Sequence, residues 1–160
     1  MSEIATRLDE RGLVLPAPLQ LPPGVVLPFP MVNIRGKRAF VSGHGPLEAD
    51  GSMAAPLGKL GAEVSVEEGY VLATKTGLAI LASLQSALGD LDRITGWGKI
   101  LGMVNSAPGF AQQPAVINGF TDLIIDVFGE EKGAHARSAV GMSELPFNMA
   151  VEIEAEVSIR

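Results

Sequence analysis

The stretch Val151-Glu152-Ile153-Glu154-Ala155-Glu156-Val157 lies close to the end of the chain and alternates strictly between apolar and acidic residues. Side chains point to opposite faces at successive positions of a β-strand. The stretch is therefore predicted to be a strand whose apolar row faces a core. Its acidic row must face water or a partner subunit.

Two upstream segments are predicted to be helices that cover the apolar row. Ser65-Val66-Glu67-Glu68 is a capping box, and Gly89 is a natural helix stop. Between them apolar residues recur at helical spacing, namely Val71, Leu78, Leu81, Leu84 and Leu88. Pro114 opens a second helix that ends at Gly129. Its apolar face comprises Val116, Ile117, Phe120, Leu123, Ile124, Val127 and Phe128.

The remaining regular segments are predicted to be strands, at residues 31–34, 39–42, 94–104, 136–142 and 149–159. Arg35-Gly36-Lys37-Arg38 joins the first two as a hairpin turn. This order of elements predicts an α+β fold in which both helices cover one face of a four- or five-stranded sheet.

The N-terminal part of the chain has a different character. Residues 2–11 are predicted to form a short helix, and six prolines between Pro16 and Pro30 then disfavour regular structure. We therefore divide the chain into an N-terminal helix and proline-rich arm, residues 1–24, and a single domain, residues 25–160. A chain of 160 residues is long enough to bury its own core.

Composition excludes several classes of protein. The net charge of -6 and pI near 4.9 argue against a surface that neutralises nucleic-acid phosphates. The chain has no cysteine and its first residues lack a signal-like pattern, so we expect a cytoplasmic protein. We expect no membrane-spanning stretch, because none looks both long enough and free enough of charge.

The sequence predicts no cofactor and no metal. His44 and His135 lack a third ligand and a recognisable ligand spacing. The glycine-rich segment from Ser42 to Pro46 lacks the Gly-Lys-Ser/Thr ending of a phosphate loop, and it is interpreted as a tight turn with His44 near a pocket.

Four segments together carry a resemblance to a known family. They are Val41-Ser42-Gly43-His44-Gly45-Pro46, Ala136-Arg137-Ser138-Ala139-Val140, Leu145-Pro146, and Val151-Glu152-Ile153-Glu154-Ala155. In order and spacing they resemble the Rid (YjgF) family of imine and enamine deaminases, whose members are also labelled L-PSP endoribonucleases or translation inhibitors. The resemblance covers about residues 25 to 160.

The resemblance implies a chorismate-mutase-like α+β fold that assembles as a homotrimer, with sites between subunits. It implies that Arg137 clamps the carboxylate of a small substrate and that Glu152 holds the attacking water. It places Ser42 and Gly43 at the pocket floor. The chemistry is consistent with these residue types: arginine pairs a carboxylate through two donors, and a well-placed general base contributes roughly 100- to 10,000-fold to a rate.

Several positions depart from the family pattern. Phe29 stands where characterised deaminases have a tyrosine, Ala139 where many members have a reactive cysteine, and His44 where a glutamine is common. The segment 107–117 is longer than in short members, so either Asn118 or Thr121 could occupy the polar position near the substrate.

Three functions therefore stay open. The first is hydrolytic deamination of 2-imino or enamine acids to 2-oxo acids and ammonia. The second is binding of small carboxylates without turnover. The third and least favoured is an endoribonuclease or translation inhibitor. Each key residue also has a purely structural interpretation: Arg137 as the ion-pair partner of a carboxylate, and Glu152 as part of a solvated acidic face.

Overall fold

The computed structural model describes residues 2–160. Its helices are α1 (Glu3–Glu10), α2 (Val66–Leu88) and α3 (Gln113–Gly133), with short 3₁₀ turns η1 (Leu91–Arg93) and η2 (Pro146–Asn148). Its strands are β1 (Val32–Arg35), β2 (Arg38–His44), β3 (Ile94–Asn105), β4 (Ala136–Met142) and β5 (Val151–Ile159).

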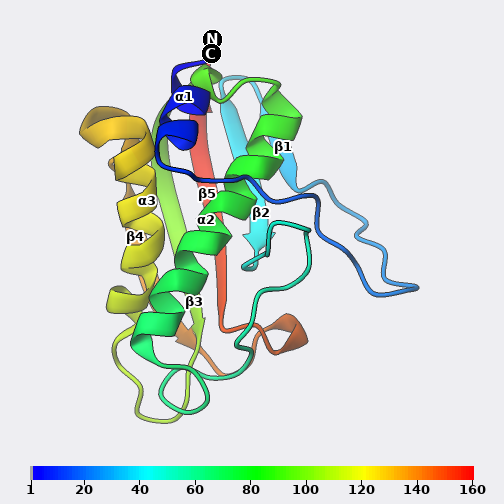
Figure 1. Cartoon of the computed structure of the whole chain (residues 1–160), viewed down its shortest axis with the longest axis vertical. Helices are drawn as coiled ribbons and strands as arrows, with labels where there is room; N and C mark the ends of the chain where they lie inside the picture. The colour runs from blue at the N-terminus through cyan, green and yellow to red at the C-terminus, as the bar shows by residue number, and fades with distance from the viewer. Residues whose placement is uncertain (1) are drawn as a thin grey trace.

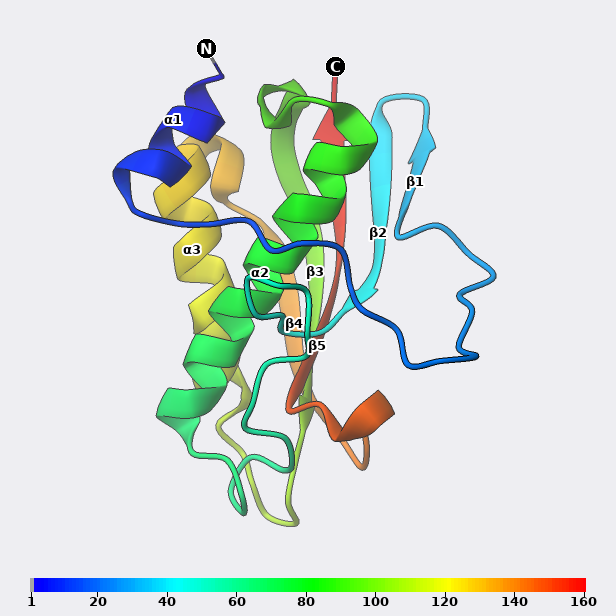
Figure 2. The same cartoon turned by 45° about the vertical axis from the view of Figure 1, so that its right-hand side comes forward.

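The strands form one sheet in the order β1-β2-β5-β3-β4. Only the β3–β4 pair is parallel, and α3 makes the crossover between these two strands. Helices α2 and α3 lie side by side on one face of the sheet (Figures 1 and 2). The predicted α+β architecture, with both long helices on one face, is confirmed.

The alternation in β5 has the predicted consequence. The side chains from Val151 to Ile159 at every second position are buried beneath the helices, whereas Glu154 is exposed and Glu152 is half-buried on the opposite face. The long strand β3 pairs with β5 along its length, so these two strands form the centre of the sheet.

The signals at the helix ends are also confirmed. Both hydrogen bonds of the capping box at Ser65 are present, at 2.8 and 3.1 Å. Gly89 ends α2 with a φ of 79°. Gly129, the predicted end of the second helix, has a left-handed φ of 79° and interrupts α3 four residues before its last residue, Gly133. The prediction that Val71 belongs to the buried face of this helix is wrong. Its side chain is 53% exposed, because the buried face of α2 includes Leu72 instead.

The N-terminal helix is part of the folded body. Ile4 and Leu8 belong to the main core. The Asp92 carboxylate accepts hydrogen bonds from the Glu3 and Ile4 amides at 2.7 and 2.9 Å, so a distant residue caps α1. Arg11 pairs with Asp126 of α3.

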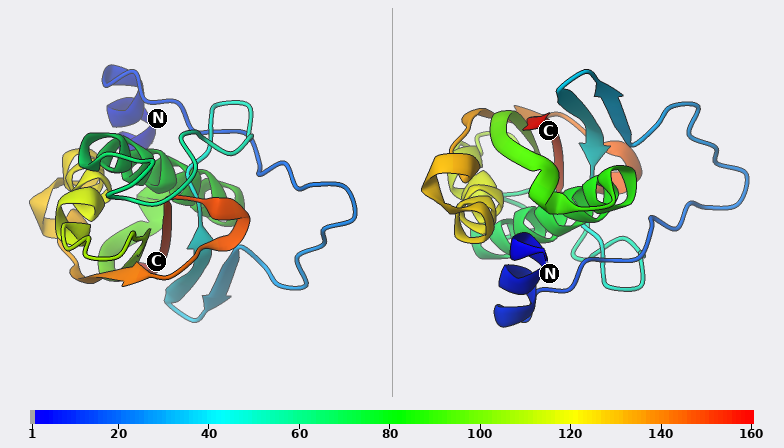
Figure 3. Two further views of the ribbon diagram at one scale, coloured as in Figure 1. Left: turned by 90° about the horizontal axis from the view of Figure 1, so that it is seen from below. Right: turned by 90° about the horizontal axis from the view of Figure 1, so that it is seen from above.

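The proline-rich arm leaves α1, crosses α2 and then loops away from the body before β1 (Figures 1 and 3). Two backbone hydrogen bonds fix its first half on the turn that follows β2. The Ala17 amide donates to the Ala49 carbonyl at 2.9 Å, and the Gln20 amide donates to the Gly51 carbonyl at 3.0 Å. These bonds therefore fix the position of the arm where it crosses α2.

Among the described residues one helix, α2, is long and apolar enough to cross a membrane by length and composition. The sequence expectation that no such stretch exists is wrong on that criterion. Half of the apolar window is buried inside the fold, as in a core helix, and a single helix of this kind is weak evidence for a membrane span.

Candidate functional site

Glu152 lies near the start of β5, opposite Met103 of β3 and next to Gly43 of β2. A Cβ atom at Gly43 would overlap the Glu152 carboxylate. Glycine at this position therefore allows the carboxylate to lie directly against the β2 backbone. Burial raises the pKa of Glu152, and the negative charge of Glu154 raises it further. A carboxyl with a raised pKa is better suited to exchange protons near neutral pH.

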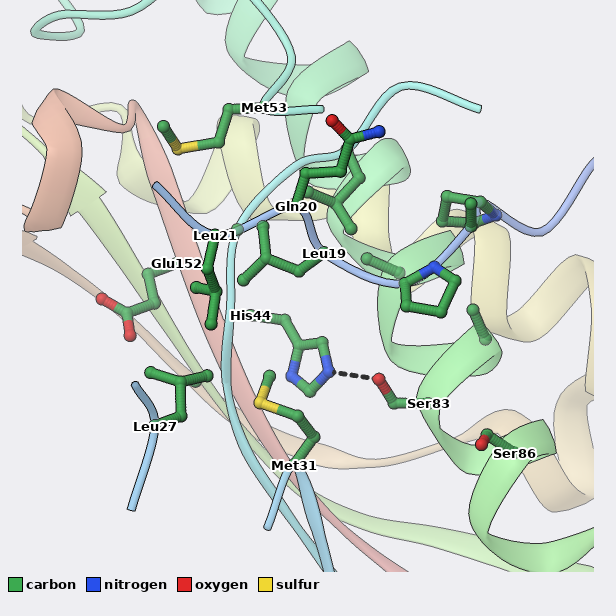
Figure 4. A pocket seen from close by; sticks show the side chains of 18 of the residues that line it. Leu19, Gln20, Leu21, Leu27, Met31, His44, Met53, Ser83, Ser86 and Glu152 are labelled. Atoms are coloured by element: carbon green, nitrogen blue, oxygen red, sulfur yellow. Dashed lines mark hydrogen bonds between the residues drawn. The ribbon is translucent and has the colours of Figure 1, made fainter. Parts of the chain in front are cut away.

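Glu152 borders a cavity of about 740 Å³ between the arm, α2 and the end of β2 (Figure 4). The arm contributes one wall, with residues from Leu15 to Pro22. The rest of the lining is mostly apolar and includes Leu27, Phe29, Met31, Met53 and Met149. Among the described lining residues Glu152 is the single carboxylate and His44 the single imidazole. The cavity is large enough for a small organic ligand.

His44 is 5% exposed and lies at the end of β2, where its ring hydrogen-bonds on both sides. Its Nδ1 lies 2.6 Å from the Ser42 carbonyl, which can only accept, so Nδ1 carries the proton. Nε2, at 2.8 Å from Ser83 Oγ, then accepts from that hydroxyl. Burial lowers the pKa of His44, which favours this neutral ring. His44 lines the cavity, as expected, but the tight turn expected for this segment is wrong at Ser42 to His44, because these residues continue β2.

Ser42 and Phe29 lie together at the mouth of the site. The Ser42 hydroxyl donates to the Pro30 carbonyl at 2.9 Å, and its amide donates to the Met31 carbonyl at 3.0 Å. Phe29 is 50% exposed and lines both the large cavity and a smaller hollow beside Ser42. These bonds fasten the end of the arm to β2 and place the Phe29 ring between the two hollows.

Arg137 lies on the edge strand β4 and points toward α3. Its Nη1 donates to Thr121 Oγ1 at 2.9 Å, and its Nη2 donates to the Pro114 carbonyl at 3.2 Å. These bonds use only part of the donor set of a guanidinium. Arg137 is half-buried, so its remaining donors can reach a ligand from the edge of the sheet.

His135 orients Thr121 within the same network. Its Nδ1 lies 2.7 Å from the Gly133 carbonyl and must donate, so Nε2 accepts from Thr121 Oγ1 at 3.0 Å. The Thr121 hydroxyl thus accepts from Arg137 and donates to His135. Burial lowers the pKa of His135, and the positive charge of Arg137 lowers it further. The neutral ring that this network requires is therefore favoured.

The two candidates on α3 differ in their contacts. Thr121 bonds to Arg137, whereas Asn118 is exposed one turn earlier. Ala139 is half-buried two positions after Arg137 on β4 and packs against the core. Of the two polar positions that the sequence left open, Thr121 is the one that touches Arg137 within this chain.

Arg137 and Glu152 do not meet in one chain. Arg137 pairs with Ile100, which pairs with the buried Ala155, so all three side chains share the helix-covered face. Glu152 pairs with Met103 and belongs to the opposite face. Side chains at paired positions point to the same side of a sheet, so the sheet itself separates the cation from the carboxylate.

Sequence reasoning missed the wall of the cavity that α2 provides. Ala79, Ala82, Ser83, Ser86 and Ala87 line it, and they recur at helical spacing on one side of the helix. This run of small residues was the available signal, because a helix face without large side chains leaves space beside it. His135 was considered only as a metal ligand and is instead part of the Arg137 network.

Within residues 2–160 no group of three or more His, Cys, Asp or Glu side chains is arranged to hold a metal ion. The polar groups therefore form two separate sets in one chain: Glu152 and His44 at the cavity, and Arg137, Thr121 and His135 beside α3. The first set can activate water, and the second can bind a carboxylate ligand.

Several known proteins are similar in sequence to this protein over nearly its whole length. Protein TCP17 of Trypanosoma cruzi is 40% identical over 156 residues, which cover 98% of this chain and 94% of that protein. The crystal structure of Atu1372 from Agrobacterium tumefaciens, a protein of unknown function, is 41% identical with a TM-score of 0.85. That similarity covers 98% of this chain and 91% of Atu1372.

The crystal structure of a Shewanella oneidensis protein, described as a putative endoribonuclease, is 28% identical with a TM-score of 0.87. That similarity covers 98% of this chain and 99% of the Shewanella protein. The family model described as "YjgF/chorismate_mutase-like, putative endoribonuclease" matches residues 7–155. That match begins within the N-terminal segment that the sequence set apart from the domain. The match over nearly the whole chain shows that the protein belongs to the YjgF/chorismate mutase-like family.

Proposed function

We propose that the protein hydrolyses reactive 2-imino or enamine acids to 2-oxo acids and ammonia, at sites that two copies of the chain build together. The observation that carries this proposal is the separation of Arg137 and Glu152 by the sheet. Each is half-buried and reachable from its own side. A second copy that brings its Arg137 to the Glu152 of the first would complete a site for a small carboxylic acid.

The sheet face that carries Glu152 supports contact with another copy. Phe40 pairs with Glu156 on this face and is 39% exposed. Val140, which pairs with Met103, is 38% exposed. Exposed apolar groups among carboxylates are typical of a surface that a partner covers. We propose a homotrimer, in which head-to-tail contacts close a ring and repeat the same site at each interface.

The chemistry follows from the two groups. Arg137 of one copy holds the substrate carboxylate and orients the carbon of the protonated imine toward Glu152 of the other. Glu152 takes a proton from water as the water oxygen bonds to that carbon, which gives an amino alcohol. Glu152 then returns the proton to the nitrogen. As the carbon–nitrogen bond breaks, the hydroxyl group of the amino alcohol gives its proton to Glu152 and becomes the carbonyl of the 2-oxo acid, and the released ammonia takes that proton away as ammonium. The raised pKa of Glu152 suits both proton transfers.

The test combines an amino-acid oxidase, which generates the imino acid, with a measurement of 2-oxo acid release. Glu152→Gln is expected to slow turnover by roughly 100- to 10,000-fold. Arg137→Ala is expected to cost about 30-fold or more, because it removes the charged partner of the substrate carboxylate. Glu67→Gln at the start of α2 and Arg160→Ala at the end of the chain, both at exposed residues, are the matched controls.

Mixing the two inactive variants tests where the site lies. If each site takes Arg137 from one copy and Glu152 from the next, co-expressed Arg137→Ala and Glu152→Gln chains regain about a quarter of wild-type turnover by random assembly. A mixture as inactive as its parts would contradict the shared site. Equal oxo-acid release with and without the wild-type protein, over several imino acids, would refute the deaminase.

Two observations keep other functions in view. Phe29 brings no hydroxyl to the mouth of the site, which favours binding of a carboxylate without turnover. In that case 2-oxo acids would stabilise the wild type and Glu152→Ala but not Arg137→Ala, with no deaminase activity.

The endoribonuclease label of the family and of the Shewanella protein favours RNA cleavage. The charge of -6 argues against it, and RNA cleavage that survives purification and is lost in a point variant would overturn that order.

A further inference from the structure

The cavity under the arm is far larger than the carboxylate-bearing end of a 2-imino acid requires. It occupies about 740 Å³ and extends from Glu152 to α2. Figure 4 shows Glu152 on one side and Ser86 on the other, with Leu21, Leu19 and His44 between them. A substrate held at Glu152 therefore has a long space beside it.

The sequence explains why this space is open. The α2 residues that line the cavity are too short to fill the gap, namely Ala79, Ala82, Ser83, Ser86 and Ala87, and the one longer side chain, Gln85, is held by its hydrogen bond to the Gly89 carbonyl. The arm cannot collapse onto the helix, because prolines keep it extended and its hydrogen bonds to Ala49 and Gly51 hold it in place. The cavity is thus a product of two sequence features far apart in the chain.

The walls select for an apolar ligand. Leu15, Leu19, Leu21 and Leu27 come from the arm and its loop. Met31, Met53 and Met149 are three of the six methionines, and their flexible side chains adapt to ligands of varied shape.

The polar groups deeper in the cavity present little charge. The His44 imidazole and the Ser83 hydroxyl satisfy each other, and the second ring nitrogen of His44 is taken by the Ser42 carbonyl. The one carboxylate, Glu152, lies at the end where the reacting carbon would be.

We propose that the cavity under the arm binds the side chain of the substrate, and that the preferred substrates are 2-imino acids with long apolar side chains. This proposal rests on the proposed function, because it names the substrate class of the same site. The side chain lies between the arm and the small residues of α2. The reacting carbon lies beside Glu152, and the carboxylate points away from the cavity toward the arginine of a second copy.

The experiment measures binding with stable 2-oxo acids of increasing length. Dissociation constants of 2-oxobutanoate, 2-oxohexanoate and 2-oxooctanoate are determined by calorimetry with the full chain. Because burial of one methylene improves affinity by about fourfold, each step of two methylenes is expected to lower the dissociation constant by about 15-fold while the cavity has room.

Ala82→Phe fills the cavity from α2, and Ser86→Phe fills it from the exposed rim with less disturbance of the core. Both are expected to abolish the gain with chain length and to leave 2-oxobutanoate binding unchanged. Val71→Phe, on the exposed side of the same helix, is the matched control and keeps the wild-type slope.

The outcomes separate this proposal from the deaminase. Turnover of short imino acids together with a flat chain-length series would overturn the side-chain cavity and leave the activity standing. A steep series that both phenylalanine variants flatten, in a protein that releases no 2-oxo acid, would support the cavity and refute the deaminase. A steep series that neither variant changes would place the apolar chain elsewhere and overturn the proposal.

Discussion

Arg137 lies in a polar network that its own chain closes, whereas Glu152 borders an apolar cavity in which it is the single carboxylate among the described residues. In the first region each hydroxyl and ring nitrogen has a partner, so the guanidinium is held in place before any ligand arrives. In the second region the walls are leucine, methionine, alanine and proline. The first region is suited to recognise a fixed charge, and the second to accept a variable side chain and carry out proton transfer.

The largest effect that bears on this contrast is expected at Gly43, which belongs to the apolar region. A methyl group there overlaps the Glu152 carboxylate, so Gly43→Ala must displace it. Displacement of a catalytic group by about 1 Å costs on the order of 100-fold in rate. We expect a loss of this size in 2-oxo acid release, with an almost unchanged denaturation midpoint, because the overlapping atoms belong to the end of a flexible side chain.

Gly96→Ala is the matched control for Gly43→Ala. Gly96 also lies in the sheet, and a Cβ atom there would meet nothing within 4 Å. Equal rates for Gly43→Ala and the wild type would mean that Glu152 does not act from the position that the structure gives it.

The second prediction concerns His44, which joins the apolar region to the β2 backbone. Its folded-state pKa is lowered by burial, so the unfolded chain takes up a proton first as the pH falls below about 6.5. The free energy of unfolding should therefore fall as the pH is lowered, by up to about 1.4 kcal/mol per pH unit. The raised pKa of Glu152 acts in the opposite direction, since the folded state then takes up the proton first.

The measurement isolates the His44 contribution by comparing variants. Urea unfolding at pH 7.5 and pH 5.5 is compared for the wild type, His44→Asn and His135→Asn, in a Glu152→Gln background that removes the opposing effect. His44→Asn should reduce the pH dependence. His135→Asn should reduce it too, by less, because His135 is less buried. A pH dependence that is unchanged in His44→Asn would contradict the buried neutral ring.

The sequence predicted the helices and strands of this fold better than it predicted how they pack against one another. Strand alternation in β5, the capping box at Ser65 and the glycine stop at Gly89 are local signals, and each holds in the structure. The exposure of Val71 was missed because helical spacing alone does not fix which of two adjacent rows, Val71 or Leu72, faces the core.

The site was harder to predict because it depends on the register of strands far apart in the sequence. The sequence placed Arg137 and Glu152 on the last two strands of the chain, but it did not show that they lie on opposite faces of the sheet. That separation follows from the pairing of Ile100 with both Arg137 and Ala155. The cavity under the arm was missed for the same reason, since the arm wall, which ends at Pro22, and the α2 wall, which begins at Ala79, are far apart in the chain.

The smallest effect is expected in the polar region, at Thr121. Thr121→Val keeps the shape of the side chain and removes the hydroxyl that accepts from Arg137 and donates to His135. Loss of one hydrogen bond of this kind costs about 0.5–1.5 kcal/mol, so kcat/KM should fall by about 2- to 10-fold. The loss should appear mainly in KM, because the arginine still carries its charge but is held less firmly where the substrate carboxylate binds.

Asn118→Ala is the comparison that makes the Thr121 result informative. Asn118 is exposed on the same helix one turn earlier, so its truncation should leave KM unchanged if the network within one chain positions the guanidinium. A larger loss in Asn118→Ala than in Thr121→Val would mean that the polar contact to substrate comes from the exposed side of α3. The network around Arg137 would then be a structural support, and recognition of the carboxylate would depend on a surface that only the assembled copies create.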